Sequence, residues 1–290
     1  MIGYACINTH LREQNIYTNR KMIKRTFNQK GIEGAFSLSH QNLIDLFEIL
    51  KWNEANEIKF FRMSSDIFPW MSEWDLQDLP QQQKDLLKSI GNFARDKGHR
   101  LTFHPGPYNV LASPKEDVVL KTIKELNQHG CIMDMMELDQ TPHNKINIHI
   151  GGVYGNKLEA MNRFIINYDR LEDSAKKRLT IENDDNPNGY TIVDLGYVHD
   201  RLGIPLVFDV LHHKCNSGGI GAEMGLKGAL KTWGGIKPVI HYSESGCTKN
   251  LRKHSDFIKK IEYSDYYDTM IEAKMKEKCI FRLKNQFNFI

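Results

Sequence analysis

Six apolar runs in the sequence end in, or carry near their end, a side chain that can bind a metal ion. These side chains are His104, His149, Glu182, Asp209, His241 and Glu272. Any one of them could be an ordinary hydrogen-bonded polar residue or a helix cap. Six in consecutive runs point instead to a shared site. Imidazoles and carboxylates without thiolates suit Zn²⁺, Mn²⁺ or Fe²⁺ better than Ca²⁺ or Cu⁺.

Two further histidines extend this candidate site. His212 follows Asp209 in FDVLHH, where a D-x-x-H turn can direct a carboxylate and an imidazole to one ion. His254 stands at the expected start of a helix and could equally be a surface residue. Six to eight ligands exceed the needs of one ion, so we expect two or three divalent ions. Such a centre favours metal-assisted hydrolysis, above all of phosphodiesters, and the sequence has no Gly-x-Ser-x-Gly nucleophile motif.

The elements that must position these residues are short apolar runs alternating with longer amphipathic ones. Runs of this kind are typical of parallel strands buried on both faces. The expected strands are 2–7, 57–62, 100–104, 146–150, 178–182, 205–209, 238–241 and 269–272. The alternation predicts the α/β class and a single (β/α)₈ TIM barrel over residues 1–290, with the metal site at the C-terminal rim of the strands. A doubly wound open sheet is the main alternative, but no G-x-G-x-x-G or P-loop motif follows a strand, so no nucleotide cofactor is expected.

The segments between the strands have helical periodicity. Serines at the start of 37–53 suit capping, and Ser113 and Gly130 mark the expected ends of a further helix. We expect seven helices, at 37–53, 82–98, 113–130, 156–173, 190–202, 221–232 and 253–263.

Composition narrows the class of protein. The chain has 290 residues, 40% hydrophobic and 26% charged, with a formal net charge of +3, which excludes a disordered or purely basic protein. No stretch approaches the roughly 18 apolar residues of a membrane helix, and the N-terminus does not resemble a signal peptide. Five scattered cysteines form no C-x-x-C motif. We therefore expect a soluble, cytoplasmic protein. We interpret the histidines in loops or helices as surface residues, namely His10, His40, His99, His129, His143 and His199.

The motifs around the candidate ligands resemble those of the UV damage endonucleases, DNA-repair enzymes with a TIM-barrel fold related to endonuclease IV. The most specific combination is FHPGPY (103–108), IENDD (181–185) and FDVLHH (208–213), in this order. Matching segments extend over nearly the whole chain: GYACIN (3–8), TNR (18–20), FFRMSSDIFPW (60–70), HIGGVYGNK (149–157), HYSES (241–245) and IEAKMKE (271–277).

The resemblance implies incision of the phosphodiester immediately 5′ to a lesion in double-stranded DNA, leaving 3′-hydroxyl and 5′-phosphate ends. Lesions in the family include cyclobutane pyrimidine dimers, 6-4 photoproducts and often abasic sites. Manganese is the typical ion, with Zn²⁺ or Mg²⁺ as alternatives. Carried over by position, the metal ligands are the eight residues named above. We assign the catalytic chemistry to four of them: Glu182, Asp209, His241 and Glu272.

Three positions depart from the family pattern. Members often have a histidine about eleven residues beyond the arginine of FFR. This chain has Glu73 at that position. We keep Glu73 as a predicted ligand because a carboxylate can bind a hard metal ion. Some members have a modified lysine two residues before His241, where this chain has Val239, so we expect no bridging carbamate there. Many relatives have Gln-Tyr after HPG, a pair that probes the duplex opposite the lesion; here Pro107 precedes Tyr108, and together they can still act as an apolar wedge.

Further residues are expected to contact the damaged DNA. Tyr4 and Asn8 match positions near the flipped lesion in the family, although both could also be ordinary packing residues at the rim. Phosphate contacts are expected from the basic segments 20–25, 176–178 and 250–260, each of which could equally be a solvated face. We expect a monomer that binds damaged double-stranded DNA and no membrane.

Two other functions are compatible with the sequence. A TIM-barrel sugar isomerase or epimerase shares a metal set of Glu, Asp and His residues but generally needs fewer ligands and an enclosed pocket. A damage-binding protein that has lost catalysis would account for Val239, but every other ligand position is filled by a competent residue.

Overall fold

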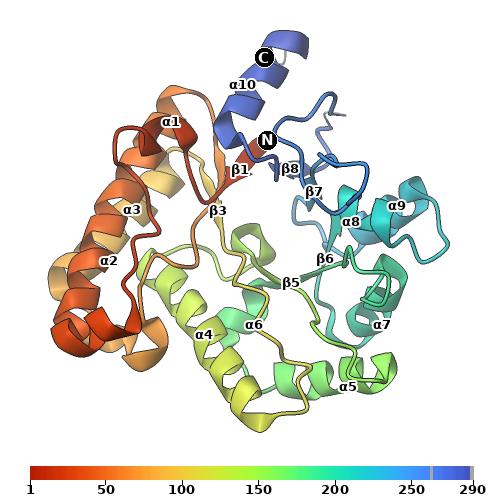
Figure 1. The fold of residues 1–290 in the computed structure, drawn as a ribbon, viewed down its shortest axis with the longest axis horizontal. Coiled ribbons are helices and arrows are strands. Elements are labelled where there is room, and N and C mark those ends of the chain that lie inside the picture. The colour runs from red at the N-terminus through yellow and green to blue at the C-terminus, as the bar shows by residue number, and fades with distance from the viewer. Residues whose placement is uncertain (262–263, 288–290) are drawn as a thin grey trace.

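Eight parallel strands form a near-closed ring in this computed structural model, which describes residues 1–261 and 264–287. The strand order is β3-β2-β1-β8-β7-β6-β5-β4. The two ends of the sheet meet because Phe103, after β3, forms a parallel bridge with Ile146 of β4. The strands are β1 (Ile2–Ala5), β2 (Phe60–Arg62), β3 (Arg100–Thr102), β4 (Ile146–Ile148), β5 (Leu179–Glu182), β6 (Leu206–Asp209), β7 (Val239–Tyr242) and β8 (Asp268–Ile271). The predicted TIM barrel is confirmed (Figure 1).

All eight predicted strands are present, most of them shorter than expected. Nearly all their residues are buried, as the continuous apolar runs predicted. The ladder ends before the ligands at two places: His104 lies two residues beyond β3, and His149 lies one residue beyond β4. These side chains leave the sheet where the chain turns at the rim.

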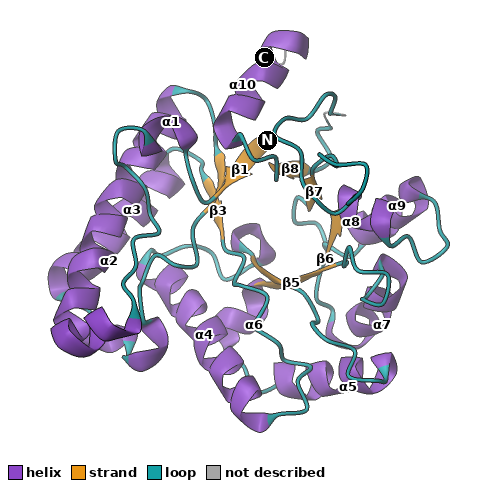
Figure 2. Cartoon of the chain, in the orientation of Figure 1, coloured by secondary structure: helices purple, strands orange, loops and turns teal. Residues whose placement is uncertain are grey.

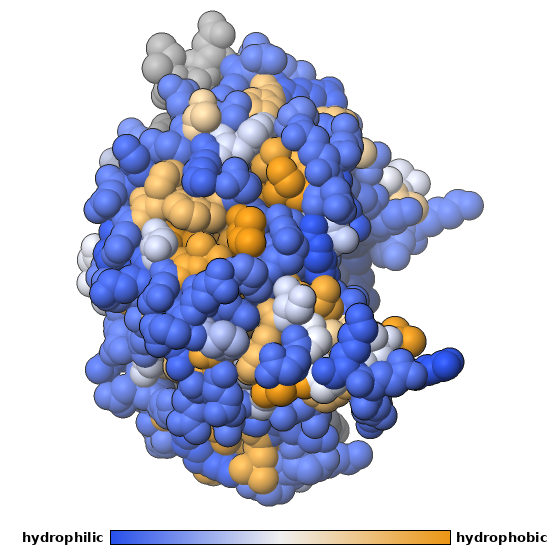
Figure 3. Space-filling view, turned by 90° about the vertical axis from the view of Figure 1, so that its left-hand side faces the viewer, coloured by the Kyte–Doolittle hydropathy of each residue, from blue (hydrophilic) through white to orange (hydrophobic). Residues whose placement is uncertain are grey.

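Helices surround the strands, as Figure 2 shows. They are α1 (Thr9–Arg12), α2 (Lys24–Ala55), α3 (Gln81–Asp96), α4 (Glu116–Met135), α5 (Lys157–Tyr168), α6 (Asp173–Arg178), α7 (Ile192–Leu202), α8 (Val210–Cys215), α9 (Ala222–Lys231) and α10 (Lys276–Phe287). The side of the barrel that carries α2 and α3 is mostly hydrophilic, with separate hydrophobic patches (Figure 3). No helix in the described part of the chain is long and apolar enough to cross a membrane.

The predicted helix ends were wrong at three places. Helix α2 begins at Lys24, so the serines expected to cap residue 37 lie inside it, and Ser39 donates its hydroxyl to the Ala35 carbonyl. Helix α4 begins at Glu116 and continues through Gly130. A glycine is needed there because a Cβ atom would lie 2.8 Å from Ser174 Oγ. The helix expected at 253–263 is absent over 253–261, and residues 262–263 lie outside the described part.

The end of the barrel opposite the rim has a charged interior. Arg100, at the start of β3, is fully buried and donates to Asp268 Oδ2 at 2.9 Å and to three backbone carbonyls. Asp268 also accepts from the Met1 amine at 2.5 Å. A buried ion pair needs such additional partners because each charge has lost its water. These contacts fix the starts of β1, β3 and β8 relative to one another.

Candidate metal centre

The C-terminal ends of β3 to β8 bring eight of the predicted ligands to one rim, and seven of them form three overlapping groups. In each group the donor atoms all lie within 4.8 Å of one another: His104–His149–Glu182, Glu182–Asp209–His212 and Asp209–His241–Glu272. Glu182 and Asp209 each belong to two groups, so the three groups are continuous. Carboxylates shared in this way are suited to bridging neighbouring metal ions.

Glu182 lies at the centre of this cluster and is 1% exposed. Its Oε2 atom lies 3.1 Å from His104 Nε2 and 2.9 Å from His241 Nδ1. Its Oε1 atom lies 3.3 Å from His212 Nδ1, which is also 2.8 Å from the Asn183 carbonyl oxygen. Glu182 is the last residue of β5, so its side chain lies at the C-terminal rim of the barrel.

The D-x-x-H sequence forms the turn that the spacing predicted. Asp209 ends β6 and caps α8, accepting the backbone N–H of His212 on Oδ1 at 2.7 Å. This cap places the imidazole of His212 beside the carboxylate that precedes it. The other oxygen, Asp209 Oδ2, is buried without a hydrogen-bond partner. A buried, unpaired carboxylate oxygen within a ligand cluster is a fitting place for a cation.

His254 reaches the rim on the loop between β7 and β8. It pairs with Ser245 in an antiparallel bridge, and its Nδ1 lies 2.9 Å from the Glu272 carbonyl oxygen. The predicted position at the start of a helix was therefore wrong, because the loop folds back on itself as a hairpin. This hairpin brings the imidazole beside Glu272.

Burial and neighbouring charges shift the pKa values of the cluster in different directions. Burial raises the pKa of Asp209 to about 7 and lowers that of His241 to about 4. Burial also disfavours the charged form of His212, but the carboxylates of Asp209 and Glu182 raise its pKa to about 9. For Glu182, burial is outweighed by His241 and His104, which hold its pKa well below the usual range. Several sites thus hold protons that a cation would displace.

Four residues support the ligands without having been predicted from the sequence. Arg62, the last residue of β2, donates to Glu272 Oε1 at 2.5 Å, and Asn147 of β4 donates to Glu182 Oε2 at 2.5 Å. Asp184 Oδ1 lies 2.7 Å from His149 Nδ1. Lys145, just before β4, has its Nζ 3.1 Å from His241 Nε2. Strand alternation could have indicated Asn147 and Lys145, two residues apart and facing the barrel interior.

Comparison with known proteins agrees with this geometry. The family model described as UV-endonuclease UvdE matches residues 1–290. The chain belongs to this family.

Individual relatives within the UvdE family match along nearly the whole chain. A UV DNA damage endonuclease of Clostridium perfringens is 38% identical, covering 98% of this chain and 70% of that protein. The UV-damage endonuclease of Schizosaccharomyces pombe is 35% identical over 99% of this chain, which spans 50% of that protein's length. The crystal structure of SacUVDE matches with a TM-score of 0.89 at 31% identity, covering 100% of this chain and 99% of that one.

A more distant likeness concerns the fold alone. The D-psicose 3-epimerase of Clostridium cellulolyticum H10 matches with a TM-score of 0.52 at 12% identity, over 78% of each chain. At this identity the likeness shows only a shared barrel.

The structure does not bring Glu73 into the cluster. It ends the short 3₁₀ helix η1 (Met71–Glu73) and its side chain is exposed. Trp70, which precedes this helix, has a positive φ of 58° and stacks on Phe27 with ring centroids 4.8 Å apart. These contacts hold the loop after β2 in a course that directs Glu73 to solvent.

Tyr4 and Asn8 are at the rim end of β1 but are fully buried. The Tyr4 hydroxyl donates to Asn53 Oδ1 at 2.7 Å and accepts from Asn8 Nδ2 at 2.9 Å. Asn8 also caps α1 by accepting the Leu11 N–H. In this conformation both side chains are occupied by contacts within the protein, so their predicted contact with a lesion stays a prediction.

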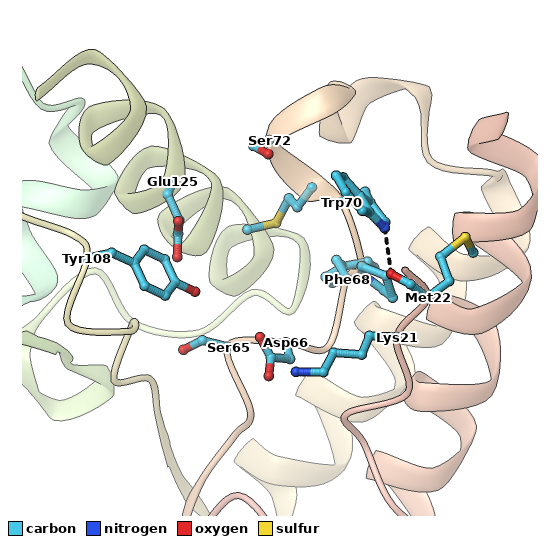
Figure 4. A pocket seen from close by; sticks show the side chains of 11 residues that line it. Lys21, Met22, Ser65, Asp66, Phe68, Trp70, Ser72, Tyr108 and Glu125 are labelled. Carbon is cyan, nitrogen blue, oxygen red and sulfur yellow. Dashed lines mark hydrogen bonds between the residues drawn. The ribbon is translucent and has the colours of Figure 1, made fainter. Parts of the chain in front are cut away.

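Tyr108 is 63% exposed and Pro107 is exposed beside it on the loop after β3. The Tyr108 ring lies directly over Gly106, where a Cβ atom would be 2.5 Å from its Cε1. Tyr108 also borders a cavity of about 320 Å³, with Glu125 on its side and Lys21 and Trp70 on the other (Figure 4). The loops after β1, β2 and β3 form this cavity, so it opens at the same rim as the ligand cluster.

Two of the remaining predictions about surface residues were wrong. Both His99 and His129 are buried: the His99 ring packs against Phe93, and the His129 ring packs against Phe103.

The three basic segments predicted to contact phosphates lie at different ends of the barrel. Segment 176–178 precedes β5 and therefore lies at the end away from the rim. Segments 20–25 and 250–260 follow β1 and β7 and lie at the rim.

Proposed function

We propose that this chain is a metal-dependent DNA-repair endonuclease that incises the phosphodiester immediately 5′ to UV photoproducts, and also at abasic sites. The observation that carries the proposal is the continuous set of three ligand groups sharing Glu182 and Asp209, in a chain that belongs to the UvdE family. Each chain carries the whole set, so the site needs no second subunit and we propose a monomer of one barrel.

The cluster fits two or three divalent ions, with Mn²⁺ as the proposed ion. When bound, these ions would supply positive charge at the scissile phosphate and activate a water molecule. Glu182 and Asp209 would each hold two ions, while His104, His149, His212, His241 and Glu272 would hold one each. His254 completes the set from the hairpin. The unpaired Asp209 Oδ2 atom and the mixed nitrogen and oxygen donors support this assignment.

The chain's own residues also prepare the cluster electrostatically. Arg62 holds Glu272 in a buried ion pair, which fixes the carboxylate and offsets part of the negative charge of the three acids. His212 has a pKa raised to about 9 by Asp209 and Glu182 against the effect of burial. Without a cation it is therefore protonated near neutral pH, and it would release that proton on binding one.

Recognition of the duplex is assigned to the rim beside the cluster. Tyr108, with Pro107, forms the exposed apolar edge that would enter the base stack. Segments 20–25 and 250–260 provide cations on two sides of the cluster, which suits contacts with phosphates. Tyr4 and Asn8 would reach a flipped lesion only after exchanging their mutual hydrogen bonds for contacts with DNA.

Incision of a defined substrate tests the proposal. Purified protein with Mn²⁺ should nick a duplex carrying one pyrimidine dimer immediately 5′ to the dimer and leave the undamaged duplex intact. Tyr108→Ala should reduce the preference for damaged duplex while metal content stays unchanged. Tyr266→Ala, at an 84% exposed tyrosine just before β8 at the opposite end of the barrel, is the matched control. A protein loaded with metal that leaves the dimer duplex uncut would refute the proposal.

Metal content also distinguishes the alternative of a sugar isomerase or epimerase. Two or three ions per chain support the nuclease, whereas one ion per chain with turnover of a ketose or aldose would support the isomerase.

A further inference from the structure

Four histidines of the cluster share one arrangement. In each of them an oxygen outside the metal-binding atoms lies close to Nδ1: the Pro105 carbonyl at 3.3 Å for His104, Asp184 Oδ1 at 2.7 Å for His149, the Asn183 carbonyl at 2.8 Å for His212, and the Glu272 carbonyl at 2.9 Å for His254. An imidazole that donates its Nδ1–H in this way has its lone pair on Nε2. For these histidines, Nε2 is the nitrogen available to a cation.

His241 is oriented the other way round. Its Nδ1 faces the carboxylates of the cluster, 2.9 Å from Glu182 Oε2 and 3.3 Å from Glu272 Oε1. Its Nε2 points down the barrel, where Lys145 Nζ lies 3.1 Å away. The ring itself is fully buried. A different nitrogen therefore serves the third ligand group, and a different partner holds it.

Lys145 occupies an unusual place for a lysine. Its side chain is fully buried inside the barrel, between the charged layer of Arg100 and Asp268 below and the cluster above. A lysine in such a place loses its hydration and is seldom found without a specific partner. Val239, two residues before His241 on the same strand β7, is apolar and its side chain offers no hydrogen bond.

We infer that Lys145 is a positioning residue for His241: through Nε2 it fixes the ring so that Nδ1 is the nitrogen that binds the cation of the Asp209–His241–Glu272 group. The contact between Nε2 and Lys145 Nζ holds the ring in the orientation in which Nδ1 faces Glu182 and Glu272. Lys145 touches neither substrate nor the reacting atoms and acts only through His241.

This inference rests on the proposed metal centre and deepens it. Partners that orient a metal-binding histidine typically change metal affinity by about 10- to 100-fold when removed. The effect of losing Lys145 should fall on the third group alone, because the other four histidines keep their own partners. The structure thus predicts the loss of one ion rather than a uniform weakening of all of them.

The test compares substitutions at Lys145 in the full chain. Lys145→Met keeps the apolar length but removes the hydrogen-bonding atom, while Lys145→Gln supplies an amide group that can hydrogen-bond with Nε2. Lys237→Met is the matched control, because Lys237 pairs with Asp268 at the far end of the barrel, 3.1 Å away. Zn²⁺ and Mn²⁺ content per chain is measured by elemental analysis after dialysis. Selective ¹⁵N-histidine NMR of the Zn²⁺-loaded protein identifies the coordinating nitrogen of His241, assigned by its absence in His241→Gln.

In the wild type we expect Zn²⁺ on Nδ1 of His241 and on Nε2 of the four other histidines. Lys145→Met should lose about one ion per chain or bind it at least 10-fold more weakly, and Lys145→Gln should recover most of the loss. Zn²⁺ on Nε2 of His241, or unchanged ion content and affinity in Lys145→Met, would overturn the inference. If Lys145→Met does not fold, the wild-type spectrum still decides. A wild type that binds neither metal refutes the metal centre itself, which is a separate outcome.

Discussion

Replacing Glu182 by glutamine is the sharpest perturbation of the metal centre. The two side chains have nearly the same size, so the change removes one buried charge without opening a cavity. Glu182 belongs to two of the three ligand groups, hydrogen-bonds with His104 and Asn147, and lies 2.9 Å from His241 Nδ1. Glutamine offers only one acceptor oxygen and places an N–H group where a cation would bind. We therefore expect weaker metal binding and no incision.

The size of the effect follows from these contacts. Loss of a shared ligand should weaken Mn²⁺ binding by about 100-fold or more, the upper end of the range for supporting residues, which corresponds to roughly 2.7 kcal/mol. At a Mn²⁺ concentration about 1,000 times the wild-type Kd, bound metal stabilises the wild type by about 4.1 kcal/mol and the variant by only about 1.4 kcal/mol. For a chain of this length the difference corresponds to a smaller metal-induced rise in Tm of roughly 5 °C or more.

Thermal unfolding with and without Mn²⁺, alongside incision of a dimer-containing duplex, measures both effects. Glu223→Gln, at an exposed glutamate of α9 that pairs with Lys227, is the matched control and should behave as the wild type. We expect Glu182→Gln to fold when treated with EDTA, to gain little stability from Mn²⁺ and to leave the duplex uncut. A variant that keeps the full metal-induced rise in Tm would show that Glu182 is not a ligand.

Three further outcomes test other parts of the structure. The pKa of Asp209 is raised to about 7 and that of His212 to about 9, so both groups hold protons at pH 6. Mn²⁺ must displace these protons, so its affinity should rise from pH 6 to pH 9, and calorimetry in buffers of different ionisation enthalpy should detect proton release. A pH-independent affinity would contradict this. Gly106→Ala should displace the Tyr108 ring and lower the preference for damaged duplex by about tenfold, without changing metal content; unchanged discrimination would argue against Tyr108 as a probe. Asp268→Asn should destabilise the fold by about 3 kcal/mol or more, because it leaves the buried Arg100 guanidinium and the N-terminal amine without their carboxylate. The loss is measured as a lower Tm, and a Tm within a degree of the wild type would refute that role.

The barrel could be predicted from the sequence because its strands are buried on both faces and read as uninterrupted apolar runs. Helix ends were less predictable, since tertiary contacts override local signals. Gly130 resembled a helix stop, yet α4 continues through it where it passes close to Ser174. The hairpin that carries His254 was predicted as a helix because its pairing depends on a partner, Ser245, that local periodicity does not reveal.

The ligand cluster was also largely predictable, because strand ends in this fold meet at one rim and the residue types there were distinctive. Two of its supporting residues were not. Arg62 and Asp184 contact ligands that lie 210 and 35 residues away along the sequence. Glu73 was predicted as a ligand from its position relative to the family pattern, but it lies outside the cluster. A position transferred from relatives does not determine the course of the loop that carries it.

The order of the ligands along the chain has a consequence for how the protein is made. The three ligand groups are completed one after another as the polypeptide leaves the ribosome. Glu272 comes last and directly follows β8. This strand closes the sheet by pairing with β1, where Ile2 lies opposite Thr269. Pairing between such distant segments is among the slowest steps of folding. A half-synthesised or prematurely ended chain therefore lacks both a closed barrel and the third ligand group. On the proposed function, the capacity to cut DNA therefore arises only once the chain has been made through Glu272.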